Sequence, residues 1–145
     1  MNHEDYMRIA IEEAKKGDLP YGAILVKDDK VVMRGYNTAQ RDHDVSAHGE
    51  INVLRQFTKE TGNYALDALK GYTLYTTCEP CAMCAAACIW AGLSEIVYGA
   101  SVEQLLSIGS EQIDISCQTI IDKGFQKVKV VSGILAEDCL ALFQE

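Results

Sequence analysis

The sequence lacks the compositional extremes that mark disordered, fibrous or repetitive chains. It has only 2 prolines in 145 residues, and no segment is repeated or of low complexity. Hydrophobic residues make up 48% and charged residues 23%, which are ordinary values for a folded globular protein. A chain of this length buries a single core, so we expect one domain over residues 1–145.

The sequence also lacks a long apolar run. No segment is long and apolar enough to span a bilayer, and the start of the chain has no signal-peptide core. The first residues, MNHEDYMRIAIEEAKKGD, mix acidic with apolar side chains. We therefore expect a cytoplasmic protein with no membrane partner.

An excess of positive charge is missing as well. The chain has 13 Lys and Arg against 21 Asp and Glu, which gives a formal net charge of -8. Such a charge repels phosphate backbones unless a local basic patch overrides it. The composition thus disfavours a nucleic-acid partner and favours a small molecule.

Cysteine, in contrast, is plentiful. Four of the 6 cysteines lie close together, at positions 78, 81, 84 and 88. Without a secretory signal, such clustering indicates reduced thiols that hold a metal ion or a cluster rather than disulfides.

Segments with strand-like and helix-like patterns alternate along the chain, which predicts an α/β fold. We expect three α/β/α layers, with a mixed sheet of about five strands and helices on both faces. The expected strands are 21–27, 30–36, 72–77, 95–99 and 128–131. The expected helices are one between Asn2 and Gly17, one over 48–61, one with Pro80 as its first residue, a short one capped by Ser101 and one over 136–143.

The strongest chemical signal combines His48 with Cys81 and Cys84. The two cysteines are three residues apart at the start of a helix and therefore project from the same face. The helix N-terminus favours their thiolate forms. Two thiolates and one imidazole nitrogen leave the fourth position of a tetrahedral ion open, as in catalytic zinc sites. We predict one zinc ion per chain.

Glu50 is the candidate catalytic residue. A zinc ion with two thiolates and a neutral imidazole is formally uncharged, so its water needs help from a nearby base. In mid-helix, residues two apart point about 200° apart. We therefore expect His48 at the helix entrance and Glu50 reaching the open coordination position, where a carboxylate can transfer protons.

Two other readings of the cysteines stay open. The spacing C-x2-C-x2-C-x3-C from Cys78 to Cys88 is that of an iron–sulfur ligand run, although Ile89 stands where proline is expected. Alternatively, Cys78 or Cys88 supplies a fourth ligand and closes a structural zinc site. If neither holds, Cys88, Cys117 and Cys139 belong to the core.

The pattern H-x-E followed by P-C-x-x-C resembles the cytidine deaminase superfamily of zinc hydrolases. Segments 20–23, 35–37, 44–48 and 75–84 look like the branch that contains bacterial guanine deaminase, fungal cytosine deaminase and tRNA adenosine deaminase. The resemblance implies the α/β/α fold, a homodimer, zinc on His48, Cys81 and Cys84, and proton transfer by Glu50. It also implies substrate contacts by Asn37, Ala47 and Trp90.

The resemblance implies a hydrolytic deaminase that releases ammonia from a free nucleobase, with guanine as the first substrate and cytosine or isocytosine as the second. Trp90 and the run Cys78-Glu-Pro-Cys81 are similar to guanine deaminase, whereas Gly49 is similar to fungal cytosine deaminase. A tRNA adenosine deaminase is the alternative, although residues 136–145 contain no basic residue, unlike the basic extension typical of those enzymes. Residues 107–115 resemble none of these three kinds of deaminase, and we expect this segment to form the far wall of the substrate pocket.

Overall fold

The computed structural model describes residues 1–144 and contains a five-stranded mixed sheet with the order β2-β1-β3-β4-β5. β1 is antiparallel to both of its neighbours, whereas β3, β4 and β5 are parallel. The strands are β1 (Gly22–Lys27), β2 (Lys30–Tyr36), β3 (Thr73–Cys78), β4 (Glu95–Ala100) and β5 (Lys129–Val131).

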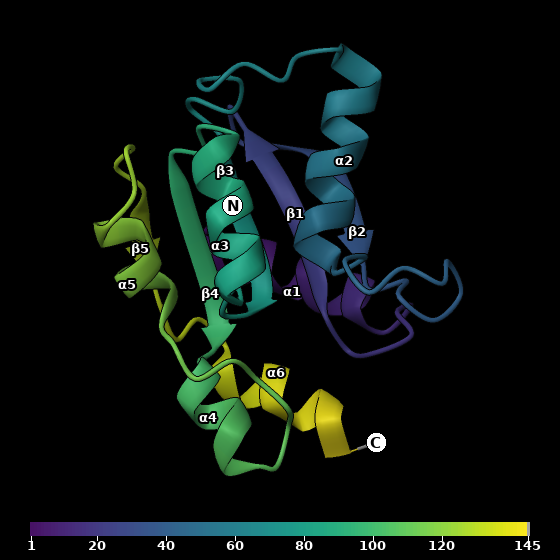
Figure 1. The fold of residues 1–145 in the computed structure, drawn as a ribbon. Coiled ribbons are helices and arrows are strands. Elements are labelled where there is room, and N and C mark those ends of the chain that lie inside the picture. Colours follow the sequence, from purple (N-terminus) through teal and green to yellow (C-terminus); the bar gives the residue numbers. More distant parts are fainter. Residues whose placement is uncertain (145) are drawn as a thin grey trace.

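Helices cover both faces of this sheet, because successive β1 side chains point to opposite sides. Ala23 and Leu25 pack into the core beneath α2, α3 and α5, whereas Ile24 and Val26 pack beneath α1 and α6. Figure 1 shows α2 and α3 in front of the strands and α1 behind them, which confirms the three layers. The helices are α1 (His3–Ala14), α2 (Gly49–Thr61), α3 (Ala82–Trp90), α4 (Val102–Ser107), α5 (Cys117–Asp122), α6 (Ala136–Ala141) and a 3-10 turn (Leu142–Gln144).

Local sequence signals account for most of these boundaries. Asn2 caps α1 by accepting a 2.9 Å hydrogen bond from the backbone N–H of Asp5. Gly62 ends α2 with φ 67°, a left-handed conformation that glycine adopts without strain. Asp28 and Asp29 both have positive φ, as a tight hairpin turn between β1 and β2 requires.

Two local features differ from the sequence analysis. α3 begins at Ala82, so Pro80 is not its first residue; Cys81 caps the helix with an extended backbone. α5 was not predicted, because a helix of six residues is too short to show a clear periodicity.

Within residues 1–144, the helices are too short or too polar to cross a membrane.

Candidate active site

The site lies where α2 and α3 begin. His48 is the residue that caps α2, Cys81 caps α3, and Cys84 follows in the first turn of α3. The Nδ1 atom of His48 lies 3.7 Å from Cys81 Sγ and 3.6 Å from Cys84 Sγ. Among residues 1–144, these three form the one group of potential metal ligands whose ligand atoms all lie within 4.8 Å of one another.

These distances fit a zinc ion. Tetrahedral zinc, with bonds of about 2.3 Å to sulfur and about 2.0 Å to nitrogen, separates the nitrogen and sulfur ligands by about 3.6 Å. The observed separations of 3.7 and 3.6 Å match that value. Three protein ligands leave the fourth position to water or substrate, as in catalytic sites.

The two thiols differ in acidity. The hydrogen bond with Cys84, followed by that with His48, lowers the pKa of Cys81 to about 4. The same contact with Cys81, together with burial, raises the pKa of Cys84 far above its ordinary value. The lowered pKa of Cys81 favours the thiolate form that a metal ion binds, and Cys84 would have to lose its proton to join it as a ligand.

Glu50 lies beside this cluster without being one of its ligands. The backbone of His48 is extended, with φ -71° and ψ 157°, so its side chain does not follow the helical spacing that would point it away from Glu50. Glu50 is 5% exposed, and burial raises its pKa to about 7. A carboxyl group with that pKa can both accept and donate a proton near neutral pH.

A cavity of about 190 Å³ opens in front of these residues. Tyr21 and Asn37 line it as well, and the segment between α4 and α5 contributes Glu111, Gln112 and Ile113 to its wall. The expectation that the far wall lies within 107–115 is consistent with this placement.

Asn37 is a buried residue of the cavity lining. The side chain is 2% exposed, and its Oδ1 accepts a 3.1 Å hydrogen bond from the backbone N–H of Ala39. Asn37 lines the cavity, so its Nδ2 group is a candidate donor for a ligand.

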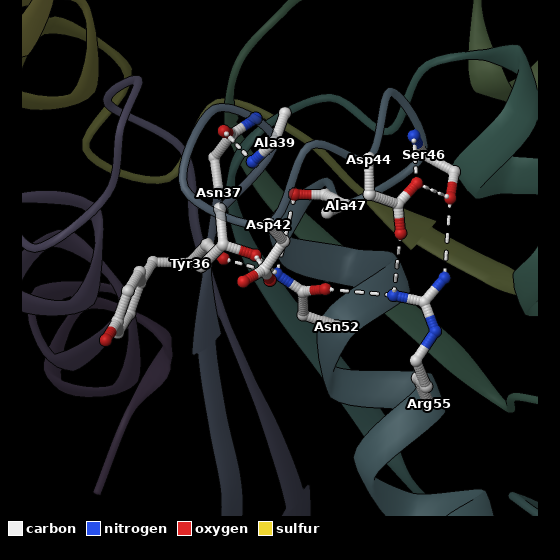
Figure 2. A network of polar contacts seen from close by, with 10 residues as sticks. Tyr36, Asn37, Ala39, Asp42, Asp44, Ser46, Ala47, Asn52 and Arg55 are labelled. Carbon is white, nitrogen blue, oxygen red and sulfur yellow. Dashed lines mark hydrogen bonds and ion pairs between the residues drawn. The ribbon is translucent and has the colours of Figure 1, made fainter.

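A polar network holds the loop between Asn37 and His48 (Figure 2). The amide of Asn52, one turn into α2, donates to the Tyr36 carbonyl at 2.8 Å and to the Thr38 hydroxyl at 2.9 Å. The network thereby joins the end of β2 to α2, and so fixes Asn37 relative to His48.

Ala47 and Trp90 do not line this cavity. Ala47 is fully buried, and its carbonyl accepts a 3.0 Å hydrogen bond from Thr38, as part of the loop network. Trp90 follows Cys84 by six residues, which turns it about 240° around α3. It is 62% exposed and packs against Phe125, so within one chain it does not reach the metal ligands.

The remaining cysteines do not join the cluster. Cys78 and Cys88 are buried, at 2% and 0% exposure, and burial raises the pKa of both thiols. Neither belongs to the group of close ligand atoms found within residues 1–144. The structure therefore supports neither the iron–sulfur run nor a closed zinc site. Cys117 and Cys139 are buried as well, as expected.

Sequence reasoning missed three residues around the site. Asn52 organises the loop, and Gln112 and Glu79 line the cavity. Only weak signals in the sequence point to these residues. Asn52 is a polar residue on the inner side of α2, Gln112 is an amide in the segment that matches no known branch, and Glu79 is a carboxyl group beside Pro80.

A zinc-binding triad with a buried carboxyl group at one cavity defines a zinc hydrolase. Comparison with known proteins gives the family. The profile of the cytidine and deoxycytidylate deaminase zinc-binding region matches residues 1–100. The chain therefore belongs to this family, and it is a zinc-dependent hydrolytic deaminase of the cytidine deaminase superfamily.

Individual relatives point to two branches. The chain is 38% identical to the tRNA-specific adenosine deaminase of Haemophilus influenzae over 141 residues, covering 94% of this chain and 78% of the relative. It is 37% identical to the guanine deaminase of Bacillus subtilis over 105 residues, covering 69% of this chain and 65% of that protein. A structure from a study of tRNA:A34 deaminases that edit the wobble position superposes with a TM-score of 0.76 at 30% identity, covering 95% of this chain and 98% of that one.

Proposed function

We propose that the protein removes the amino group of a free nucleobase, with guanine as the first substrate and cytosine or isocytosine as the second. The observation that carries this proposal is the character of the cavity. Its volume of about 190 Å³ suits a single heterocycle, and its described lining contains three glutamates but neither lysine nor arginine. A cavity with this lining offers a phosphate group no cationic partner.

The reaction is the hydrolysis of a carbon–nitrogen bond: water adds to the ring carbon that bears the amine, and ammonia leaves. His48, Cys81 and Cys84 would hold the zinc ion, which when bound would activate that water. Glu50 takes the first proton from the water and delivers it to the adjacent ring nitrogen. It then takes the second proton from the hydroxyl group that has added to the carbon and passes it to the amine, so that the C–N bond breaks as the carbonyl forms. Its burial beside the cluster suits it to these transfers.

Substrate recognition in this proposal begins at Asn37. Its Nδ2 group is the free donor, so it binds an acceptor on the ring, such as a carbonyl oxygen or an unprotonated ring nitrogen. Gln112 also lines the cavity, where its Oε1 atom is a candidate acceptor for a donor on the ring.

Deamination of the wobble adenosine of tRNA is the second candidate, and sequence similarity favours it. Several relatives are named tRNA-specific adenosine deaminases. They are 30–38% identical to this chain over more than 90% of its length. A flipped-out base also fits a cavity of this size. Against it stands the net charge of -8, which weakens contacts with phosphates.

One assay separates the two candidates. Ammonia release is measured from guanine, cytosine, isocytosine, adenosine and a tRNA anticodon stem-loop, each at low and at high salt. The free-base proposal predicts ammonia from a free base with little dependence on ionic strength. Inosine in the stem-loop, with no free base deaminated and with activity falling steeply as salt rises, establishes the tRNA candidate instead.

We further propose a homodimer that uses the outer faces of α2 and α3. A groove of about 740 Å³ lies there, lined mostly by apolar side chains such as Leu54, Phe57, Ala87 and Trp90. Small residues on α3 allow a second helix to approach closely. In this arrangement Trp90 contacts the partner chain rather than the substrate of its own chain.

Sedimentation at micromolar concentration tests the dimer. The dimer predicts twice the mass of a single chain, and Trp90→Asp is expected to shift the protein toward monomer. Val32→Asp is the matched control, because Val32 is also exposed, at 44%, but lies on β2 away from the groove. A wild-type protein that sediments only as a monomer contradicts the proposal.

A further inference from the structure

Glu79 makes an unusual set of contacts for a residue outside the catalytic group. It is 5% exposed, and its two carboxyl oxygens accept hydrogen bonds from two different segments. Oε1 accepts from the backbone N–H of Val102 at 2.8 Å, and Oε2 accepts from the backbone N–H of Cys117 at 2.7 Å. Its own N–H donates to the carbonyl of Ala100 at 2.7 Å.

These contacts bracket the far wall of the cavity. Val102 is the first residue of α4 and Cys117 the first of α5, and the segment 108–116 between the two helices contains neither helix nor strand. That segment carries the wall residues, among them Gln112. Figure 1 shows this chain passing from α4 to α5 as an open loop. The carboxyl group of Glu79 thus holds the chain before the wall and again directly after it.

Glu79 also belongs to the chain that positions the metal ligands. It precedes Cys81 by two residues, between the end of β3 and the start of α3. We propose that Glu79 is a positioning residue that fixes the substrate wall, residues 108–116, relative to the zinc ligands Cys81 and Cys84. This inference rests on the proposed function, in that the cavity between them is the one that receives the substrate.

The middle of the wall has a separate anchor. Gln112 donates through Nε2 to the Tyr21 hydroxyl at 2.9 Å and to the Ser110 hydroxyl at 3.2 Å. Tyr21 directly precedes β1, so this anchor ties the wall to the sheet but not to α3. Only the Glu79 contacts, among the hydrogen bonds of the described residues, link the segment's flanks to the turn that carries the metal ligands.

A carboxyl group is the side chain that these contacts require. Both partners are backbone N–H donors, so both side-chain oxygens must accept. In Glu79→Gln the side-chain amide offers one oxygen, and its NH2 group faces a second donor. A buried N–H group without an acceptor is costly, so one of the two segments moves away.

The consequence falls on substrate binding more than on the chemical step. Glu50 and the zinc ligands are positioned by α2 and α3, whose contacts do not involve the carboxyl group of Glu79. Loss of its contacts therefore raises KM while kcat changes little, which is the behaviour of an interaction equal in ground state and transition state.

The test compares Glu79→Gln with wild type and with Glu13→Gln as a matched control. Glu13 is also buried, at 3% exposure, and bonds Lys16 at 2.8 Å, but it lies on α1 away from the cavity. Zinc content, amide hydrogen exchange of the zinc-loaded proteins, and kcat and KM with guanine are measured. For Glu79→Gln we expect full zinc content, exchange at Val102, Cys117 and the wall faster by about tenfold, and KM higher by about tenfold. The control is expected to change none of these.

The outcomes separate this inference from the proposed function. If wild type deaminates no free base, the proposed substrate is wrong, and kcat and KM are measured with the anticodon stem-loop; hydrogen exchange decides the role of Glu79 in either case. Unchanged exchange in residues 102–117 of Glu79→Gln overturns the inference. Loss of zinc, or faster exchange throughout the chain, also overturns it, because Glu79 then supports the whole fold rather than the wall.

Discussion

Glu50→Gln is expected to raise the stability of the zinc-free protein at pH 8 and to lower the turnover of the zinc-loaded protein. The carboxyl group is buried, and its pKa in the zinc-free fold is about 7 against an ordinary value of 4.5. The folded state therefore holds this proton more tightly than the unfolded state does. Stability from this group is fully present below pH 4.5 and is lost as the pH rises through 7.

The size of the effect follows from the difference between the two pKa values. At about 1.4 kcal/mol per pKa unit, ionising Glu50 costs the zinc-free protein about 3 kcal/mol at pH 8. Glutamine occupies almost the same volume and carries no charge at any pH. Zinc-free Glu50→Gln should consequently be more stable than wild type by about 3 kcal/mol at pH 8, and about equally stable at pH 4.

Urea unfolding of the two zinc-free proteins at pH 4 and pH 8 measures this difference. In the zinc-loaded protein, the same substitution should retain the metal and lower turnover by about 10²-fold or more, because no group remains to transfer protons. A variant less stable than wild type at pH 8 refutes the reasoning about burial. A variant with near-normal turnover refutes the catalytic role.

Four further substitutions test the site and its support. Cys84→Ser should lose most of the bound zinc, whereas Cys88→Ser should keep one zinc per chain by metal analysis; loss in both variants would indicate a closed site. Asn52→Asp should cost about 1–3 kcal/mol in urea unfolding, because its second oxygen would face the carbonyl and hydroxyl oxygens that the amide now donates to. Gly22→Ala should cost a similar 1–3 kcal/mol or so, because a Cβ atom there overlaps the backbone of α1 at Ala10 and Ala14. Unchanged urea midpoints in these last two variants would contradict the respective contacts.

The positions of the metal ligands and Glu50 were predictable because these residues lie in two short sequence motifs. His48 and Glu50 are two residues apart, Cys81 and Cys84 three, and each pair starts a helix, so spacing alone restricts their geometry. The strands and long helices were predictable for the same reason, through periodicity and caps. The short α5 was not, because it is defined by its packing more than by its pattern.

Residues that act through distant partners escaped the sequence analysis. Glu79 bonds backbone groups 23 and 38 positions away, and Gln112 bonds a tyrosine 91 positions away. No local sequence pattern predicts such hydrogen bonds, because they form only when the fold brings the distant segments together. Trp90 illustrates the opposite case: an aromatic residue near a motif suggests a substrate contact, but the turn of α3 carries it to the outer surface.

X-ray absorption at the zinc edge of the zinc-loaded protein tests the central claim most directly, namely an open three-ligand site on His48, Cys81 and Cys84. The structure predicts one zinc per chain with two sulfur ligands at about 2.3 Å, one imidazole nitrogen at about 2.0 Å and one light atom from solvent. Three or four sulfur ligands, or iron with acid-labile sulfide in place of zinc, would contradict the account.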